Sequence, residues 1–134
     1  MNILITGGLG FIGSNLTSYL YKKENIKKII IIDNFHNSSL DYLKSICKFK
    51  YFDKSSKFKK TNDKVVIIKE DVSNYNFALE ITKNIDYIVH LAAESGIDVS
   101  INKPKKSFDV NVVGTFNYLN AAKVNKVKKF IFSS

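Results

Sequence analysis

The sequence contains no arginine, one cysteine and one proline among its 134 residues. The single cysteine, Cys47, cannot form an internal disulfide, which fits a reducing compartment. With one proline and 45% hydrophobic residues, the composition is typical of a globular domain and not of a disordered chain. No segment approaches the roughly 20 apolar residues that cross a bilayer, and the first residues lack the features of a signal peptide. We therefore expect a cytoplasmic protein with no membrane partner.

The absence of arginine also bears on the net charge of +9, which by itself would suggest a nucleic-acid partner. All 21 basic residues are lysines, whereas arginine is the residue that grips phosphate and guanine in bidentate fashion. Asparagine and isoleucine are abundant as well, so the charge indicates a compositional bias of the whole chain. We expect no nucleic-acid partner.

Apolar patterns predict strands that alternate with helices along one domain, residues 1–134. Four isoleucines in succession, within residues 27–33, are typical of a central parallel strand that is covered on both faces. A helix should follow the first strand, with Phe11, Leu16 and Leu20 on one face, and Lys103-Pro104 should start a long helix. The lysine-rich stretch 49–64 is expected to be an irregular, solvated insertion. The expected strands are 2–6, 27–33, 65–71, 86–93 and 128–134, and the other expected helices are 38–48, 74–84 and 104 to about 125, the last carrying Phe108, Val112, Phe116 and Leu119 on one stripe.

Five alternations with long connections predict an α/β fold in which helices cover both faces of a parallel sheet. Right-handed crossovers place the first three strands in order on one side, and the fourth strand returns to the other side of the first. That reversal predicts a crevice between the carboxyl ends of the first and fourth strands.

Glycines are concentrated where the first strand turns into the first helix. Residues 8–13, GLGFIG, fit G-x-G-x-x-G, and Asp33 follows 20 residues after Gly13, at the end of the second strand. Glycines permit the tight turn and the close approach of a pyrophosphate to the helix start, while the carboxylate accepts a hydrogen bond from a ribose hydroxyl. Because a carboxylate there repels a 2′-phosphate, the pattern favours NAD over NADP. The alternative is a tight turn followed by an ordinary aspartate at a strand end.

These residues resemble the extended short-chain dehydrogenase/reductase family, in particular its NAD-dependent sugar-nucleotide epimerases and dehydratases. The match begins with TGGLGFIG at residues 6–13 and continues with EDV at 70–72, HLAAES at 90–95, NVVGT at 111–115 and FIFSS at 130–134. The resemblance covers the whole chain and implies a Rossmann-type sheet that is truncated after the fifth strand.

The resemblance also implies which residues hold the cofactor. Gly7, Gly10, Gly13 and the amides of Phe11 and Ile12 would contact the pyrophosphate. Asp71 would meet the adenine amino group and Val72 a ring nitrogen, although Asp71 could instead simply open a turn. Asn34 and Asn37 could contact the ribose or merely form a turn, and Asn111 could fix a strand end or have no task. The remaining expected cofactor contacts are Leu91, Ala92, Ala93, Ser95 and Ser133.

We expect no catalytic residue within the 134 residues. In the family, chemistry needs a hydroxyl just beyond the strand that ends here and a Tyr-x-x-x-Lys pair on the next helix. One such pattern occurs, Tyr19 to Lys23, but it lies at the far end of the helix that starts at the glycine turn. A metal site is not expected, because His36 is the only histidine besides His90 and neither has ligands at suitable spacing.

The sequence therefore predicts the NAD-binding portion of a sugar-nucleotide epimerase or dehydratase, inactive as the isolated chain. In the parent reaction, bound NAD would transiently oxidise a nucleotide sugar at C4. The alternative is a dinucleotide-binding module without chemistry, or a chain whose site is completed by a separate polypeptide. The resemblance also makes a homodimer possible, and the sequence does not decide between epimerase and dehydratase.

Overall fold

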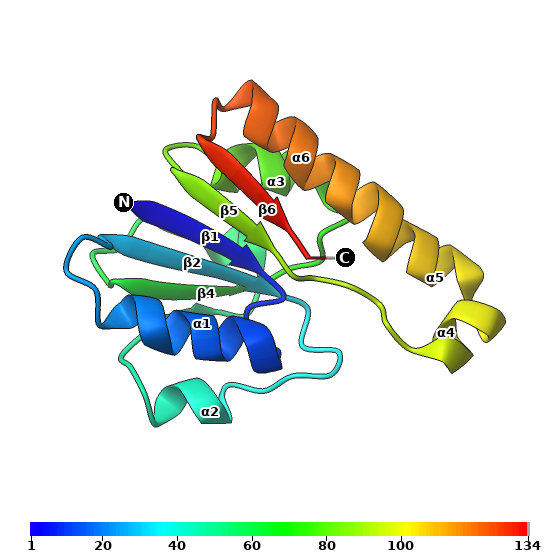
Figure 1. Cartoon of the computed structure of the whole chain (residues 1–134), viewed down its shortest axis with the longest axis horizontal. Coiled ribbons are helices and arrows are strands. Elements are labelled where there is room, and N and C mark those ends of the chain that lie inside the picture. Colours follow the sequence, from blue (N-terminus) through cyan, green and yellow to red (C-terminus); the bar gives the residue numbers. More distant parts are fainter. Residues whose placement is uncertain (134) are drawn as a thin grey trace.

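The computed structural model describes residues 1–133, which form a six-stranded sheet covered by helices (Figure 1). The strand order is β3-β4-β2-β1-β5-β6, and every neighbouring pair is parallel. This confirms the predicted α/β fold with a parallel sheet. The strands are β1 (Asn2–Thr6), β2 (Lys28–Asp33), β3 (Lys50–Phe52), β4 (Val65–Lys69), β5 (Tyr87–His90) and β6 (Lys129–Phe132).

Helices pack on both faces of the sheet, and the isoleucines of β2 contribute alternately to the apolar clusters on the two faces. Ile29 and Ile31 belong to the apolar cluster that includes residues of α2, whereas Ile30 and Ile32 belong to the cluster that includes residues of α3 and α6. Successive side chains of a strand point to opposite faces, so the middle of a strand covered twice is apolar at every position. The helices are α1 (Phe11–Tyr21), α2 (Asp41–Lys44), α3 (Tyr75–Ile81), α4 (Ile97–Asn102), α5 (Pro104–Phe108) and α6 (Thr115–Val124), with a π-helical turn at Asp109–Gly114 and a short 3₁₀ turn at Ser55–Lys57.

The chain reverses its direction across the sheet at β1. This strand pairs with β2 on one side and with β5 on the other, and Thr6 lies opposite His90 in the β1–β5 register. The carboxyl ends of β1 and β5 therefore lie side by side, as the predicted crevice requires. In a parallel sheet this is the place where ligands bind.

The prediction that residues 49–64 are irregular is wrong in part, because β3 lies within them. This strand pairs with β4, with Tyr51 opposite Ile67. The ring of Tyr51 packs 5.5 Å from that of Phe35, and the ring of Phe52 packs 5.5 Å from that of Phe58. These aromatic contacts give the strand an apolar attachment that the surrounding lysines mask in the sequence, and they add a sixth strand to the expected five.

The helices differ from the expectations in their lengths and in the faces that they bury. The helix expected at 38–48 is reduced to α2, and the long helix is divided by the π-helical turn into α5 and α6. The stripe of Phe108, Val112, Phe116 and Leu119 is exposed, because the buried positions of α6 are instead Asn117, Tyr118, Ala121 and Ala122. Phe11 is also exposed, since Gly13, Ser14 and Thr17 are the buried positions of α1. Small residues bring α1 close to the sheet, whereas the buried face of α6 combines the large ring of Tyr118 with two alanines and an asparagine.

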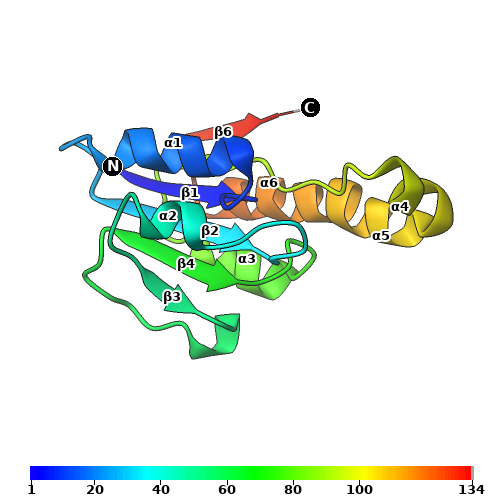
Figure 2. The same ribbon diagram turned by 90° about the horizontal axis from the view of Figure 1, so that it is seen from below.

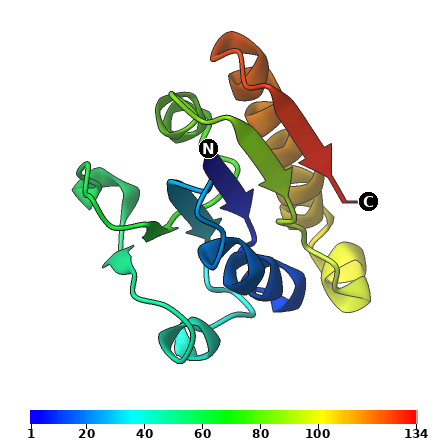
Figure 3. The ribbon, with the colours of Figure 1, turned by 60° about the vertical axis from the view of Figure 1, so that its left-hand side comes forward.

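The α4–α5 end of the long helix extends past the carboxyl edge of the sheet (Figures 2 and 3). Among residues 1–133, no helix combines the length and the apolar character that a bilayer crossing demands. The expected strand 128–134 is observed as β6, and its expected last residue, Ser134, lies outside the described residues.

Candidate functional site

The glycine turn after β1 brings the backbone of two strands into direct contact. Gly7 has φ +65°, and a Cβ atom there would lie 2.7 Å from the amide nitrogen of Ala92. A Cβ atom on Gly13 would lie 2.5 Å from Cα of Gly8. Because these neighbours are backbone atoms, neither position has room for a side chain, and only glycine adopts the conformation of Gly7 without strain.

Helix α1 begins at this turn, and the backbone N–H groups of its first turn are available as hydrogen-bond donors. Its N-cap, Gly10, supplies no side-chain hydrogen bond, and the first turn contains no acidic residue. The first N–H groups of a helix have no acceptor within the helix, and the helix dipole favours an anion there. The amides of Phe11 and Ile12 belong to this first turn. The turn can therefore bind a phosphate group through its backbone.

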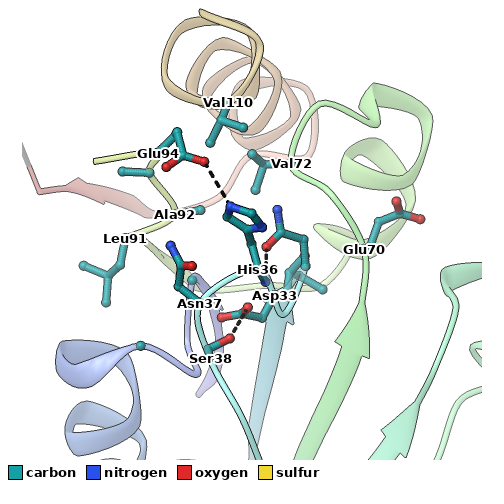
Figure 4. Close-up of a pocket in the computed structure, with 15 residues that line it drawn as sticks. Asp33, His36, Asn37, Ser38, Glu70, Val72, Leu91, Ala92, Glu94 and Val110 are labelled. Atoms are coloured by element: carbon teal, nitrogen blue, oxygen red, sulfur yellow. Dashed lines mark hydrogen bonds and ion pairs between the residues drawn. The ribbon is translucent and has the colours of Figure 1, made fainter. Parts of the chain in front are cut away.

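A cavity of about 150 Å³ opens beside the turn at the carboxyl edge of the sheet (Figure 4). Its walls come from the segments that follow four strands: Gly7 and Gly10 after β1, Asp33 to Ser38 at the end of β2, Glu70 and Val72 after β4, and Leu91 to Glu94 after β5. Val110 of the π-helical turn also lines the cavity. The predicted crevice is thus present, and nine of the predicted cofactor contacts line it: Gly7, Gly10, Asp33, Asn34, Asn37, Val72, Leu91, Ala92 and Ala93.

Asp33 is 8% exposed and is held by three hydrogen bonds. The amide of Leu9 donates to Oδ2 over 3.0 Å. The amide of Phe35 and the hydroxyl of Ser38 donate to Oδ1 over 2.9 and 2.8 Å. An ionised carboxylate offers about four lone-pair sites. One site is therefore left for a donor inside the cavity, such as a ribose hydroxyl.

The other predicted contacts lie outside the cavity lining. Gly13 packs against Gly7 and Gly8 of the turn, and the side chains of Phe11 and Ile12 are exposed. Asp71 borders a neighbouring hollow together with Asn34, whose Nδ2 donates to Asp71 Oδ2 over 3.1 Å. Burial opposes ionisation of Asp71, but hydrogen bonds from Ser73 and Asn34 outweigh it, so the pKa of Asp71 is lowered. Ser95 and Ser133 are exposed.

Asn111 clamps one wall of the cavity. Its Oδ1 accepts from the amide of Glu94 over 2.8 Å, and its Nδ2 donates to the carbonyl of Glu94 over 3.0 Å. The neighbouring Gly114 packs against Val72, where a Cβ atom would lie 2.4 Å from Cγ2. The amide of Asn111 thus has a definite task at the end of β5, one of the two alternatives that the sequence left open.

The sequence analysis missed a polar cluster that joins opposite walls of the cavity. Glu94 Oε2 lies 3.7 Å from His36 Nε2 (Figure 4). The same oxygen lies 2.9 Å from Lys106 Nζ. Lys106 Nζ also lies 2.9 Å from His36 Nε2, and in this contact the ammonium can only be the donor. The hydrogen bond from Lys106 lowers the pKa of Glu94, whose side chain is buried. These residues come from three segments far apart in sequence, and no local pattern joins them.

His90 lies beneath the cavity, fully buried at the end of β5. Its Nδ1 lies 2.8 Å from Thr6 Oγ1 and its Nε2 lies 3.1 Å from Thr115 Oγ1. Burial lowers the pKa of His90 to about 4, so the ring is neutral at neutral pH. Within the described residues, no three His, Cys, Asp or Glu side chains are arranged to hold a metal.

The Tyr-x-x-x-Lys sequence lies on the surface at the far end of α1. The ammonium of Lys23 lies 4.4 Å from the ring centroid of Tyr19, and the Tyr19 side chain is exposed. Neither residue lines the cavity. This pair therefore forms a surface cation–π contact.

Comparison with known proteins gives consistent matches over the whole chain. A model of the GDP-mannose 4,6-dehydratase family matches residues 4–134. The dTDP-D-glucose 4,6-dehydratase of Dictyostelium discoideum is 39% identical over 98% of this chain and 28% of its own length. The UDP-glucose 4-epimerase of Klebsiella pneumoniae is 30% identical over 100% of this chain and 88% of its own sequence.

A solved structure shows the same fold with ligands. The UDP-glucose 4-epimerase from Stenotrophomonas maltophila, with bound NAD and formylated UDP-arabinopyranose, matches with a TM-score of 0.78 and 26% identity. The match covers 100% of this chain and 37% of that protein. The chain therefore spans well under half of that enzyme and of the Dictyostelium dehydratase.

Proposed function

Because this chain belongs to the GDP-mannose 4,6-dehydratase family of sugar-nucleotide dehydratases and epimerases, we propose that its 134 residues are the NAD-binding portion of such an enzyme. The observation that carries the proposal is the contact of the glycine turn with Ala92, with Asp33 on the facing wall of the same cavity. The turn offers open amides to a pyrophosphate, and Asp33 offers an acceptor to a ribose. Both features face one cavity at the switch point of the sheet.

The residues present fit NAD. A side chain at Gly7 or Gly13 would displace backbone atoms, so these glycines keep the turn tight enough for a ligand to approach the amides of Phe11, Ile12 and Gly13. Asp33 retains one free acceptor site, and its charge disfavours a 2′-phosphate. We place the ribose at Asp33, Asn34 and Asn37, and the adenine at Val72 near Asp71. The backbone of Leu91, Ala92 and Ala93 forms the remaining wall.

When bound, NAD supplies a hydride acceptor for oxidation of a nucleotide sugar at C4. The residues of this chain bind and orient the cofactor and exclude water from one side of it. We propose that the 134 residues by themselves do not turn over a nucleotide sugar, because Tyr19 and Lys23 lie far from the cavity. A non-catalytic module, or a site completed by another polypeptide, remains the alternative, and NAD binding is common to all three.

Titration calorimetry with NAD and NADP tests the proposal. We expect NAD to bind more tightly, and Asp33→Asn to weaken NAD binding roughly thirtyfold, since a hydrogen bond to a charged acceptor contributes about 2 kcal/mol. The same change should narrow the preference for NAD over NADP, because the charge that repels the 2′-phosphate is lost. Asp41→Asn is the matched control, since Asp41 is exposed on α2 and pairs only with neighbours on its own segment. Equal binding of both dinucleotides by the unmodified chain, or no binding, would contradict the proposal.

The bridge from Lys106 to His36 should control the rate at which NAD enters and leaves. The cavity of about 150 Å³ is smaller than the roughly 300–1,000 Å³ typical of ligand sites, and His36 lines it, so we expect the bridge to open when a dinucleotide binds. His36→Ala removes the bridge and leaves the Lys106–Glu94 pair in place. We expect association and dissociation rates to rise together about fivefold, the effect of a lost hydrogen bond of about 1 kcal/mol, with little change in Kd.

Stopped-flow fluorescence measures both rates. His36→Gln is the matched control, because its amide oxygen can still accept from Lys106. Unchanged rates in His36→Ala would show that the bridge is not an obstacle. A rise in the dissociation rate alone would show that His36 contacts the bound dinucleotide directly.

A further inference from the structure

His90 connects the two sides of the switch point through hydroxyl groups. Thr6 Oγ1 lies at its Nδ1 and Thr115 Oγ1 at its Nε2, 2.8 and 3.1 Å away. The chain of polar contacts continues at both ends. The amide of Ala92 donates to Thr6 Oγ1 over 3.3 Å, and Thr115 Oγ1 donates to the carbonyl of Asn111 over 2.7 Å. Aromatic rings of Tyr118, Phe130 and Phe132 surround the imidazole, with centroids 5.8 to 6.0 Å away.

The geometry fixes the direction of each hydrogen bond in this chain. A threonine hydroxyl has one proton, and Thr115 gives its proton to a carbonyl, which can only accept. Thr115 Oγ1 must therefore accept from His90, which places the imidazole proton on Nε2. In the neutral ring Nδ1 is then an acceptor, so Thr6 donates to it and Thr6 Oγ1 accepts from the amide of Ala92. Only one arrangement of protons satisfies every group.

The two ends of this chain of hydrogen bonds reach the two ends of one cavity wall, the segment from Ala92 to Glu94. At one end it holds the amide of Ala92, the atom that a Cβ on Gly7 would meet at 2.7 Å. At the other end it holds Asn111, whose side chain grips both the amide and the carbonyl of Glu94. The segment from Ala92 to Glu94 is therefore fixed from both sides through a single imidazole.

We propose that His90, as its Nε2–H tautomer, is a positioning residue that sets the cofactor-facing wall Ala92–Glu94 against the glycine turn. The identity of the ligand, NAD, rests on the proposed function, whereas the hydrogen bonds of His90 do not depend on it. His90 itself does not line the cavity. Its action on a bound dinucleotide passes through Thr6 and Ala92 on one side and through Thr115 and Asn111 on the other. A loose wall would widen the gap at Gly7 and reduce complementarity to the pyrophosphate.

Two readouts test this inference. Nitrogen-15 NMR of the ligand-free chain distinguishes protonated from bare imidazole nitrogens, and we expect His90 to carry its proton on Nε2. Thr115→Val removes the acceptor for that proton and should produce a mixture of tautomers. We also expect Thr115→Val to weaken NAD binding roughly fivefold to tenfold, the range for one net hydrogen bond, and Thr115→Ser to restore both properties.

Thr82→Val is the matched control for loss of stability alone. Thr82 is a buried threonine that donates to Ala78 and accepts from Asn125, and it does not line the cavity. We expect it to destabilise the fold without changing NAD affinity or the His90 tautomer. A proton on Nδ1 in the unmodified chain, or equal NAD affinity in Thr115→Val and the unmodified chain, would overturn the inference. Absence of NAD binding by the unmodified chain would instead refute the proposed function, while the NMR result would still decide the geometry.

Discussion

Gly7→Ala should remove NAD binding and destabilise the fold by about 3 kcal/mol or more. The new Cβ would lie 2.7 to 2.9 Å from three backbone atoms of Leu91 and Ala92, so β1 and β5 would have to separate at their carboxyl ends. Overpacking of this kind costs about 1–3 kcal/mol, and a non-glycine residue in the left-handed conformation costs roughly 1–2 kcal/mol more. The same displacement would move the wall at Ala92 away from the turn. We therefore expect at least a hundredfold loss of NAD affinity, about 2.7 kcal/mol.

Urea denaturation and calorimetry on the same preparations measure the two effects. Gly10→Ala is the control for stability, because the φ of Gly10 is −68° and a Cβ there would meet only the carbonyl of Gly7, at 3.3 Å. We expect Gly10→Ala to lower the free energy of unfolding by about 1 kcal/mol or less, because alanine is a poorer N-cap than glycine. If Gly7→Ala proved as stable as Gly10→Ala, the close contact between the turn and Ala92 would be refuted.

The parts of the site that the sequence predicted are those in which local spacing encodes geometry. The glycines and Asp33 each sit at a strand end, and strand ends of a parallel sheet converge on one edge. The unbroken isoleucines of β2 predicted a strand covered on both faces. In the structure β2 pairs with β1, and the amide of Gly7 donates to the carbonyl of Ile32, the residue before Asp33, over 2.8 Å. The prediction of the crevice followed from chain reversal alone and needed no knowledge of side-chain contacts.

The parts that the sequence did not predict depend on contacts between distant residues. His36, Glu94 and Lys106 meet only because a loop after β2 and a helix after β5 approach across the cavity. Strand β3 was missed because its lysine-rich surroundings have no apolar period, and its pairing is stabilised by aromatic contacts of Tyr51 and Phe52. Tertiary packing overrides local propensity in both cases.

On the long helix, the sequence predicted a helix with an apolar stripe but not which face of that helix is buried. Helical spacing placed Phe108, Val112, Phe116 and Leu119 on one stripe, yet that stripe faces away from the sheet. The buried face carries Asn117, whose Nδ2 donates to the carbonyls of Val72 and Ser73 over 3.2 and 2.9 Å. Periodicity identifies a helix and an apolar face. It does not show which face the rest of this chain covers.

Lowering the pH from 7 to 5 should cost the fold about 2 kcal/mol through His90 alone, rising to about 3 kcal/mol by pH 4. Burial lowers the pKa of His90 from 6.5 to about 4. Between these two pH values the imidazole is protonated in the unfolded chain but neutral in the folded chain, so protonation favours unfolding. Stability is therefore fully present above pH 6.5 and is lost as the pH falls toward 4. Protonation would also disturb the hydrogen-bond chain, because a proton on Nδ1 would face the hydroxyl of Thr6 and displace its donated bond.

Urea denaturation at pH 7, 6 and 5 measures this loss, and His90→Gln should flatten the dependence because glutamine does not titrate. Carboxyl groups whose pKa values are lowered, such as Asp71 and Asp86, lose their contributions at still lower pH, below this window. If His90→Gln does not fold, an NMR titration of the unmodified chain replaces it, and the ring should remain neutral down to about pH 5. Protonation of His90 near pH 6.5 without loss of stability would mean that the imidazole has access to water, and the closed path from Ala92 to Asn111 would then be incorrect.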